Sequence, residues 1–279
     1  MKKQTRQIDT SFARAARLML PAMEETFIYL VGCGGTGSWL APAIARLVRV
    51  AREQGQNVKA EFIDPDIVEA ANIPRQNFCD AETGLHKSAT LARRYGAAWG
   101  IEIAARTERF GAPMVTNAWG RLSIIVGCVD NAAARRAIAA TLKHNLRDTH
   151  SVWWLDCGNA KESGQVLLGS AATAADLKSA FLSKKVCGRL PGPHLQAPDL
   201  LKAKPEERNG RKMSCAELMA ANAQSLTINQ AVASVAADYL ARMLGGGPLV
   251  KFATYIDQAT GSARSRAITE EEIALAAKK

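Results

Sequence analysis

The amino-acid sequence predicts an α/β protein built on a mostly parallel sheet with helices on both faces. Three observations lead to this prediction. Apolar runs of strand length recur along the chain, helical segments separate them, and a glycine-rich turn joins the first clear run to the first long helix. Strands that alternate with helices are typical of parallel sheets, because the return from one parallel strand to the next needs a crossover connection.

The expected elements follow one another from the N-terminus in a regular order. Residues 10–20 place Phe12, Leu18 and Leu20 among Ala and Arg, and this pattern predicts a helix. In the rest of the chain, short apolar runs predict buried strands, and segments with a helical pattern between them predict helices. The predicted strands cover residues 26–31, 58–63, 101–107, 122–129, 152–156 and 165–168, and the predicted helices cover residues 38–54, 85–99 and 132–145.

The regular pattern stops over about residues 183–213 and then resumes. Four prolines with charged residues between them predict a long, mobile crossover segment there. An Ala-rich helix is expected from Ser214 to about Leu244, where three glycines and a proline end it. Residues 250–256 and 263–267 are expected to form two closing strands.

Length and composition fit a folded globular chain. A chain of 279 residues with 48 % apolar and 22 % charged residues can bury a full core without disulfides or a structural metal. We expect an N-terminal helical arm over residues 1–25 and one α/β domain over residues 26–279. No apolar run is long enough to span a membrane and no signal core follows the basic N-terminus, so we expect a cytoplasmic protein without a membrane partner.

The net charge and the cysteines argue against two other classes of protein. The formal charge of +10 could attract nucleic acid, but the basic residues are scattered. The sequence contains no RNP motif, zinc finger or basic groove interleaved with aromatics, which argues against nucleic-acid binding. The six cysteines form no C-x-x-C pair, which argues against a structural zinc site.

A glycine-rich turn follows the first strand of the expected sheet. The segment from Gly32 to Gly37 has the pattern G-x-G-x-x-G and opens a helix, the context in which this pattern binds a nucleotide. Glycines permit the tight turn and let phosphate approach backbone N–H groups at the helix N-terminus. Asp64 ends the second strand, where a carboxylate can hydrogen-bond a ribose, and Asp66 is either a second partner or a cap of the loop. These features alone would also suit NAD.

Polar and basic residues beyond this acid favour a triphosphate. Asn72 and Arg75 follow it, and Lys87 stands at the head of the next helix. Cations gathered near a phosphate turn neutralise the charge of a triphosphate during attack at the α-phosphorus. Asp130 and Asn131 close another strand, where a carboxylate could hold Mg²⁺ beside the phosphates.

Five segments of the chain carry a resemblance to one superfamily. They are Val31-Gly32-Cys33-Gly34-Gly35-Thr36-Gly37-Ser38, Asp64-Pro65-Asp66-Ile67-Val68-Glu69, Asn72-Ile73-Pro74-Arg75-Gln76, Gly84-Leu85-His86-Lys87, and Asp130-Asn131 with Arg135. In this order they resemble the ThiF/MoeB/E1 superfamily, which activates ubiquitin-like proteins. The resemblance runs over residues 27–169 and again over residues 214–247. Among the subfamilies, the chain looks most like the ThiF family protein of the PRTRC system.

The resemblance implies a Rossmann-like adenylation domain with ATP and Mg²⁺ as cofactors. The implied reaction joins ATP and the C-terminal glycine carboxylate of a ubiquitin-like protein, giving an acyl-adenylate and pyrophosphate. The implied catalytic groups are Arg75, Lys87 and Asp130, the last of them on Mg²⁺. The implied nucleotide contacts are Gly32, Gly34, Gly35, Thr36, Gly37, Asp64, Asp66, Asn72, Arg75, Gln76, Lys87, Asp130 and Asn131. In this family an N-terminal arginine often reaches the partner subunit's ATP, so a homodimer is implied, with Arg14 or Arg17 as that arginine.

One cysteine is a candidate nucleophile. Some relatives pass the activated carboxylate to a cysteine as a thioester. Cys215 lies at the start of the expected long helix, after Arg211 and Lys212, where a thiolate is favoured. The alternative is an ordinary, partly buried thiol beside a helix cap formed by Ser214. Cys187 is the second candidate. The cysteines expected to serve packing are Cys33, Cys128 and Cys157.

Two other functions stay open on the sequence. A NAD(P)-binding oxidoreductase could use the same turn, but it needs a second domain with a proton donor, and the four histidines offer no obvious one. A nucleotide-binding interaction protein without catalysis is the other alternative. The joint presence of Asn72, Arg75, Lys87 and Asp130 argues against it.

Overall fold

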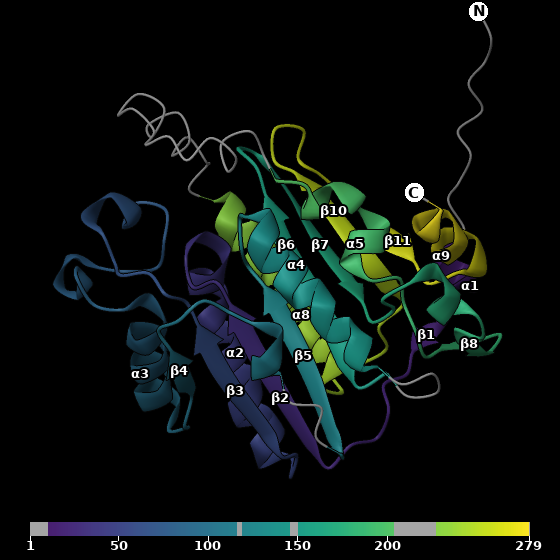
Figure 1. Ribbon diagram of the computed structural model, residues 1–279, viewed down its shortest axis with the longest axis horizontal. Coiled ribbons are helices and arrows are strands. Elements are labelled where there is room, and N and C mark those ends of the chain that lie inside the picture. The colour runs from purple at the N-terminus through teal and green to yellow at the C-terminus, as the bar shows by residue number, and fades with distance from the viewer. Residues whose placement is uncertain (1–10, 116–118, 146–149, 204–226, 279) are drawn as a thin grey trace, which may run out of the picture.

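The computed structural model describes residues 11–115, 119–145, 150–203 and 227–278 (Figure 1). This part of the chain forms one sheet of eight strands and one small sheet of three. The large sheet has the strand order β11-β10-β7-β6-β5-β2-β3-β4. Its strands are β2 (Glu25–Val31), β3 (Val58–Ile63), β4 (Ala104–Arg106), β5 (Arg121–Gly127), β6 (Val152–Asn159), β7 (Ser163–Gly169), β10 (Lys251–Asp257) and β11 (Ser262–Ala267).

The five neighbouring strands from β6 to β4 run parallel. Central strand β2 pairs with β3 on one side and with β5 on the other, and β4 and β6 extend the two sides. The chain moves outward through β3 to β4, then crosses to β5 and moves outward through β6. The direction of winding therefore reverses between β2 and β5, and ligands of doubly wound sheets bind at such a reversal.

Three antiparallel strands complete the sheet beyond β6. Strand β7 pairs antiparallel with β6, β10 with β7, and β11 with β10. The last two are the closing strands that the sequence predicts. The predicted Rossmann-like fold class, a mostly parallel sheet with helices on both faces, is confirmed.

Helices cover both faces of the large sheet. On one face lie α2 (Gly35–Glu53), α3 (Lys87–Trp99) and α8 (Ile228–Met243), and on the other lie α4 (Ala132–Thr141) and α5 (Pro193–Gln196). Successive side chains of a strand point to opposite faces. In β2, Ile28 and Leu30 therefore join the core beneath α2 and α8, while Tyr29 and Val31 join the core beneath α4.

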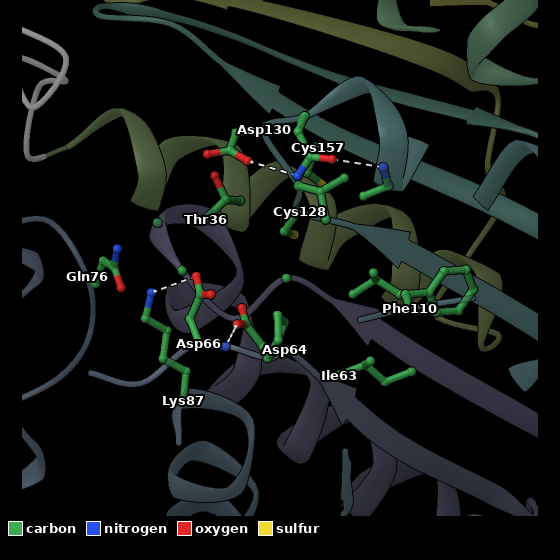
Figure 2. A pocket seen from close by; sticks show the side chains of 18 of the residues that line it. Thr36, Ile63, Asp64, Asp66, Gln76, Lys87, Phe110, Cys128, Asp130 and Cys157 are labelled. Carbon is green, nitrogen blue, oxygen red and sulfur yellow. Dashed lines mark hydrogen bonds and ion pairs between the residues drawn. The ribbon is translucent and has the colours of Figure 1, made fainter. Parts of the chain in front are cut away.

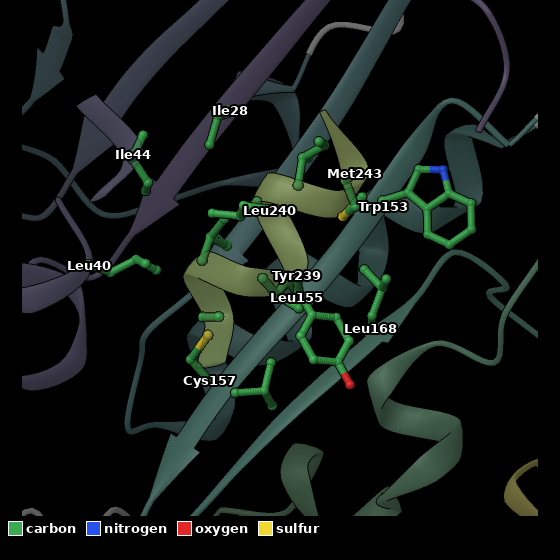
Figure 3. Packing of buried hydrophobic residues seen from close by; sticks show 14 of the residues in the cluster. Ile28, Leu40, Ile44, Trp153, Leu155, Cys157, Leu168, Tyr239, Leu240 and Met243 are labelled. Atoms are coloured by element: carbon green, nitrogen blue, oxygen red, sulfur yellow. The ribbon is translucent and has the colours of Figure 1, made fainter. Parts of the chain in front are cut away.

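The larger core is built around α8. Figure 3 shows Tyr239, Leu240 and Met243 of α8 among Leu155 of β6 and Leu168 of β7. All but Met243 of these five side chains are fully shielded from solvent. At the start of the helix, Ile228 and Val232 are equally buried in this core, so apolar packing fixes the first turn of α8 against β6 and β7.

The N-terminal segment departs from the predicted helix over residues 10–20. Helix α1 (Ser11–Arg14) is only one turn long, and the chain beyond it forms strand β1 (Arg17–Leu18). Strand β1 pairs in parallel with β9 (Val186–Cys187), which pairs in turn with β8 (Phe181–Ser183). The prediction is wrong beyond Arg14 because pairing with a distant segment outweighs the weak local helix propensity.

The start of the proline-rich segment is regular rather than irregular. After β9, helix α5 begins at Pro193 and a 3₁₀ helix, η6 (Pro198–Leu201), begins at Pro198. Proline suits the first position of a helix, because its missing N–H has no partner there anyway. The remainder of the predicted crossover segment, residues 204–213, and the first part of the predicted Ala-rich helix lie outside the described residues.

The remaining elements are short, with one helix that the sequence analysis did not predict. The 3₁₀ helices are η1 (Ala70–Asn72), η2 (Asp80–Glu82), η3 (Ala112–Met114), η4 (Leu142–His144) and η5 (Ala174–Leu177). The unpredicted helix is α9 (Glu270–Ala277), which Thr269 caps by accepting the N–H of Glu272. No helix in the described ranges has the length and apolarity to cross a membrane.

Candidate functional site

A cavity of about 970 Å³ opens at the carboxyl ends of β2, β3, β5 and β6. It lies at the reversal between β2 and β5 and is drawn in Figure 2. Twelve residues proposed from the sequence line it: Gly32, Gly34, Gly35, Thr36, Asp64, Asp66, Asn72, Arg75, Gln76, Lys87, Asp130 and Asn131. The structure thus brings together residues that lie as far apart in the sequence as Gly32 and Asn131.

Close backbone contacts shape the glycine turn. Gly32 has a φ of +88°, and a β-carbon there would lie 2.6 Å from the carbonyl oxygen of Cys128. Helix α2 starts at Gly35, and no side chain caps its first turn. Gly37 does not line the cavity; its backbone packs directly against the carbonyl group of Gly32 inside the turn. The uncapped N–H groups at the head of this 19-residue helix face a cavity suited to an anion.

Asp64 is fastened to the turn by the backbone. Its Oδ2 accepts the N–H of Cys33 at 2.5 Å, and its Oδ1 accepts the N–H of Asp66 at 2.8 Å. Burial raises the pKa of the Asp64 carboxyl, and these two hydrogen bonds oppose the rise. The carboxylate is therefore held rigidly at the edge of the cavity, as a hydrogen-bond acceptor for a ribose must be.

Cationic and amide groups form the next wall. The Nζ of Lys87 lies 3.5 Å from Oδ2 of Asp66, with the lysine side chain 7 % exposed and the aspartate 67 % exposed. Figure 2 shows these two side chains pointing toward each other, with Asp130 across the cavity. Within the described ranges, the buried Nε of Arg75 and Oε1 of Gln76 have no hydrogen-bond partner. Orphaned polar atoms beside a cavity indicate that a polar ligand completes their contacts.

The loop after β5 supplies an exposed carboxylate, and an ion pair joins the following helix to β6. Asp130 is exposed, and its Oδ1 accepts from Nδ2 of Asn131 at 3.4 Å. Asn131 also caps α4 by accepting the N–H of Ala134 at 2.9 Å. Arg135, in the same helix, donates from Nε to Oδ1 of Asp156 at 3.1 Å, and both side chains are buried.

Some lining residues were not proposed from the sequence. Arg109 and Phe110 follow β4, Asn159 ends β6, and Asn229 stands in the first turn of α8. In Figure 2, Phe110 and Ile63 lie toward the same side of the cavity. Asn159 could have been found by extending the predicted strand over residues 152–156 to its polar end. Asn229 carries no sequence signal beyond its place near a helix start.

A second cavity of about 540 Å³ adjoins the first. It lies over β7, β10 and β11, and Arg135 and Asn159 line both cavities. Small residues, among them Gly158, Ser163 and Gly164, line part of it, together with larger ones such as Tyr255 and Arg264. The two cavities therefore meet at a guanidinium and an amide.

The two N-terminal arginines lie outside the cavity of their own chain. Arg14 is exposed and forms an ion pair with Glu271 at 3.6 Å, and Arg17 is exposed on β1. Figure 1 shows α1 and β1 beside α9, at the end of the molecule away from α3. A contact of either arginine with a nucleotide therefore stays a prediction that concerns a partner subunit.

The cysteines differ sharply in environment. Cys215 lies outside the described residues. Cys187 is fully buried in β9, and its Sγ–H donates to the carbonyl of Arg189 at 3.0 Å. Burial raises its thiol pKa to about 11, so it stays protonated at neutral pH and is a poor nucleophile. Cys33 and Cys157 are also buried, whereas Cys128 is half-buried and lines the cavity with Cys157.

Comparisons with known proteins extend these observations. The sequence profile described as "ThiF family" matches residues 5–272. No curated protein matches the chain. The solved structure of PaaA is similar over 88 % of this chain and 65 % of its own, with 16 % identity and a TM-score of 0.55.

Two structures of MccB from E. coli are similar in the same way. The one with ATP matches over 92 % of this chain and 68 % of its own, with 14 % identity and a TM-score of 0.57. The one with AMPCPP and MccA matches over 87 % and 63 %, with 16 % identity and a TM-score of 0.56. The chain thus spans about two thirds of the length of these neighbours, and the likeness is one of fold.

Proposed function

Because the chain belongs to the ThiF family, we propose that it adenylates a carboxylate of its substrate with ATP. A carboxylate oxygen attacks the α-phosphorus of ATP, the bond from that phosphorus to the β-phosphate's bridging oxygen breaks, and pyrophosphate leaves with the electron pair. The observation that carries the proposal is the single cavity in which the glycine turn meets Lys87 and Arg75. Two cations facing a phosphate turn match the charge of a leaving pyrophosphate.

The surroundings of each residue indicate which part of ATP it would bind. The uncapped N–H groups of the turn would bind phosphate oxygens, and the fixed carboxylate of Asp64 would accept from the ribose hydroxyls. Lys87 would exchange Asp66 for a phosphate, since their 3.5 Å contact is long for an ion pair and Asp66 faces solvent. The orphaned Nε of Arg75 would gain a phosphate acceptor.

Mg²⁺ fits the donors at this site. No three His, Cys, Asp or Glu side chains of the described chain lie close enough together to hold a metal ion. Mg²⁺ commonly uses one or two carboxylates with substrate phosphates and water, and the exposed Asp130 offers one such carboxylate in the cavity. When bound, the ion would supply positive charge beside the phosphates, and Asp130 would hold it.

The second cavity supports a protein or peptide terminus as the substrate. Arg135 lines both cavities, and the N–H groups of its guanidinium that do not bond Asp156 would attract the entering carboxylate. We therefore propose the C-terminal glycine of a ubiquitin-like protein as the substrate, because glycines at Gly158 and Gly164 leave room there for the backbone of an extended chain end. The fold is similar to that of E. coli MccB, which was solved with ATP and, in another structure, with AMPCPP and MccA. This likeness supports a site that takes a nucleotide and a second substrate side by side.

Two further features belong to the proposal. A homodimer would let Arg14 or Arg17 reach the partner's nucleotide, and Cys215 would accept the activated carboxylate if a thioester forms. A cytoplasmic location and a role in a PRTRC system remain predictions from the sequence.

The proposal is tested by binding first and by catalysis second. ATP with Mg²⁺ should raise the melting temperature of the protein, whereas NAD at the same concentration should not, because ligands that bind only the native state stabilise it. Exchange of labelled pyrophosphate into ATP, measured with a candidate ubiquitin-like protein, should then depend on that protein's terminal carboxylate. Stabilisation by NAD but not by ATP would favour the oxidoreductase instead.

A further inference from the structure

Three polar side chains from distant parts of the chain meet at the glycine turn. They are Thr36 near the start of α2, Asn159 at the end of β6 and Asn229 in the first turn of α8. Nδ2 of Asn159 donates to Oγ1 of Thr36 at 2.9 Å and to Oδ1 of Asn229 at 2.5 Å. Oγ1 of Thr36 donates to Oδ1 of Asn229 at 3.3 Å. Thr36 is 4 % exposed, Asn229 is fully buried and Asn159 is half-buried, so the three groups form a largely buried polar cluster.

The cluster also reaches the segment of Arg75, which lines the same cavity. Nδ2 of Asn229 donates to the backbone carbonyl of Arg75 at 3.3 Å, and Nε1 of Trp39 donates to the same carbonyl at 3.3 Å. A single buried amide therefore ties the glycine turn to the backbone of Arg75. The orphaned guanidinium Nε belongs to that same residue.

The amide of Asn229 lies directly against the turn. A β-carbon on Gly35 would lie 2.6 Å from Oδ1 of Asn229, so only glycine leaves room for this contact. A carbonyl oxygen this close to a phosphate site would repel the anion if its lone pairs faced the ligand. Two donors, Thr36 and Asn159, occupy that oxygen instead. Their hydrogen bonds orient the amide so that it supports the turn without opposing the phosphate.

All three side chains line the first cavity, and Asn159 lines the second as well. We infer that Asn159 and Asn229 are positioning residues for the nucleotide, acting through the Thr36 hydroxyl and the Arg75 carbonyl. They hold the turn and the Arg75 segment in the arrangement that receives a triphosphate, so less order has to be gained on binding. The inference rests on the proposed use of ATP.

Isothermal titration with ATP and Mg²⁺, in the absence of any protein substrate, tests the inference. Thr36→Val keeps the shape of the side chain and removes the shared hydroxyl, so it should weaken ATP binding about tenfold, which corresponds to ~1.4 kcal/mol. Thr36→Ser keeps the hydroxyl and should bind ATP within about twofold of the wild type. As a single substitution, Asn159→Leu should weaken ATP binding strongly. In a chain that already carries Thr36→Val it should weaken binding only about twofold more, because the hydroxyl that Asn159 bonds is already absent.

A matched control separates positioning from stability. Thr254 is equally buried, and its hydroxyl lies 3.0 Å from the Tyr239 hydroxyl and 2.8 Å from that of Ser265, outside both cavities. Thr254→Val should lower the melting temperature as Thr36→Val does but leave the ATP affinity unchanged.

The outcomes distinguish the inference from the function on which it rests. Equal losses of ATP affinity in Thr36→Val and Thr254→Val, or no loss in Thr36→Val while the wild type binds ATP, would overturn the positioning role. Additive effects of Thr36→Val and Asn159→Leu would overturn the cluster as a unit. A wild-type protein that does not bind ATP would refute the proposed function itself, and the inference with it.

Discussion

A β-carbon on Gly37 would lie 1.9 Å from the carbonyl oxygen of Gly32, and its next contact would be the carbonyl carbon of Gly32 at 2.9 Å. The two glycines therefore close the phosphate turn against each other, backbone to backbone. Because the obstacle is backbone, no rotation of a side chain can relieve it. Gly111 lies outside the cavity in extended conformation (φ −129°, ψ 146°), and a β-carbon there would have its nearest neighbour at 3.6 Å.

Gly37→Ala should therefore destabilise the protein and deform the turn. We expect the free energy of unfolding to fall by about 2–4 kcal/mol, the range of severe packing conflicts, and ATP binding to be lost. Gly111→Ala should change the free energy of unfolding by no more than about 0.5 kcal/mol. Urea unfolding followed by circular dichroism measures both. Equal stability of the two variants would contradict the closed geometry of the turn.

Asp130→Ala should abolish most of the adenylation without unfolding the chain. Its carboxylate is exposed at the end of β5 and makes one long contact with Asn131, so its removal should leave the melting temperature nearly unchanged. The pyrophosphate exchange rate at saturating ATP and Mg²⁺ should fall about a hundredfold or more, as for other losses of transition-state charge stabilisation. Asp80→Ala, at an exposed aspartate outside the cavity, is the control. An unchanged exchange rate would remove Asp130 from the site.

His150 should make stability depend on pH in a defined window. The side chain is 5 % exposed and its Nδ1 lies 2.9 Å from the Ser170 hydroxyl. Burial, and secondly the charge of Arg189, lower its pKa from 6.5 to about 4. Between these two values the unfolded chain binds a proton that the native state does not, so stability falls as the pH falls from about 6.5 toward about 4.

The variant His150→Gln isolates this contribution. The difference in free energy of unfolding between wild type and variant should be constant above pH 7 and should shrink as the pH approaches 4. Chemical denaturation at a series of pH values provides the measurement. Parallel stability curves for the two proteins would show that the pKa of His150 is the same in the native and the unfolded state.

Cys215→Ala should separate adenylation from thiol transfer. If the position of this residue at a predicted helix start lowers its thiol pKa, the variant should keep pyrophosphate exchange and lose any reductant-sensitive adduct with the protein substrate. Cys187→Ala should keep the adduct, because the Cys187 thiol is buried and protonated at neutral pH. Mass spectrometry of the trapped complex distinguishes the cysteines. Exchange in the wild type without any adduct would mean that the reaction stops at the adenylate.

Mixed subunits should reveal whether the site is shared across a dimer. Arg14 and Arg17 lie outside the cavity of their own chain, and the ion pair of Arg14 with Glu271 is too exposed to hold it firmly. A heterodimer of an Arg14→Ala/Arg17→Ala chain and an Asp130→Ala chain contains one hybrid site with every residue intact. Pyrophosphate exchange should recover in part on mixing. No recovery in purified heterodimers would count against a contribution from the partner.

The sequence could predict the parts of the site that use glycine or follow a strand. The turn, Asp64 and Asp130 sit where backbone geometry demands particular residues or where parallel strands end. Asn159 and Asn229 could not be predicted as a pair, because their contact depends on how α8 packs against β6. That packing is decided by side chains far along the chain rather than by any local pattern.

Among the strands and helices too, those with a strong local pattern could be predicted, and those that depend on distant contacts could not. The central strands are strongly apolar, and burial on both faces makes such runs easy to recognise. Strand β1 has two residues, and its pairing with β9 leaves no local trace in a segment rich in Ala and Arg. Prolines with charged residues between them predict a long, mobile segment over residues 183–213, whereas Pro193 and Pro198 each start a short helix.

The pairing of β1 with β9 also bears on how the chain acquires its structure. Arg17 must find Val186, a residue more than half the chain away, and closing so long a loop is slow compared with joining neighbouring strands. During synthesis, residues 17–18 leave the ribosome long before their partners exist. The N-terminal strand is therefore among the last elements to dock, and its amide hydrogens should exchange with solvent sooner than those of β2.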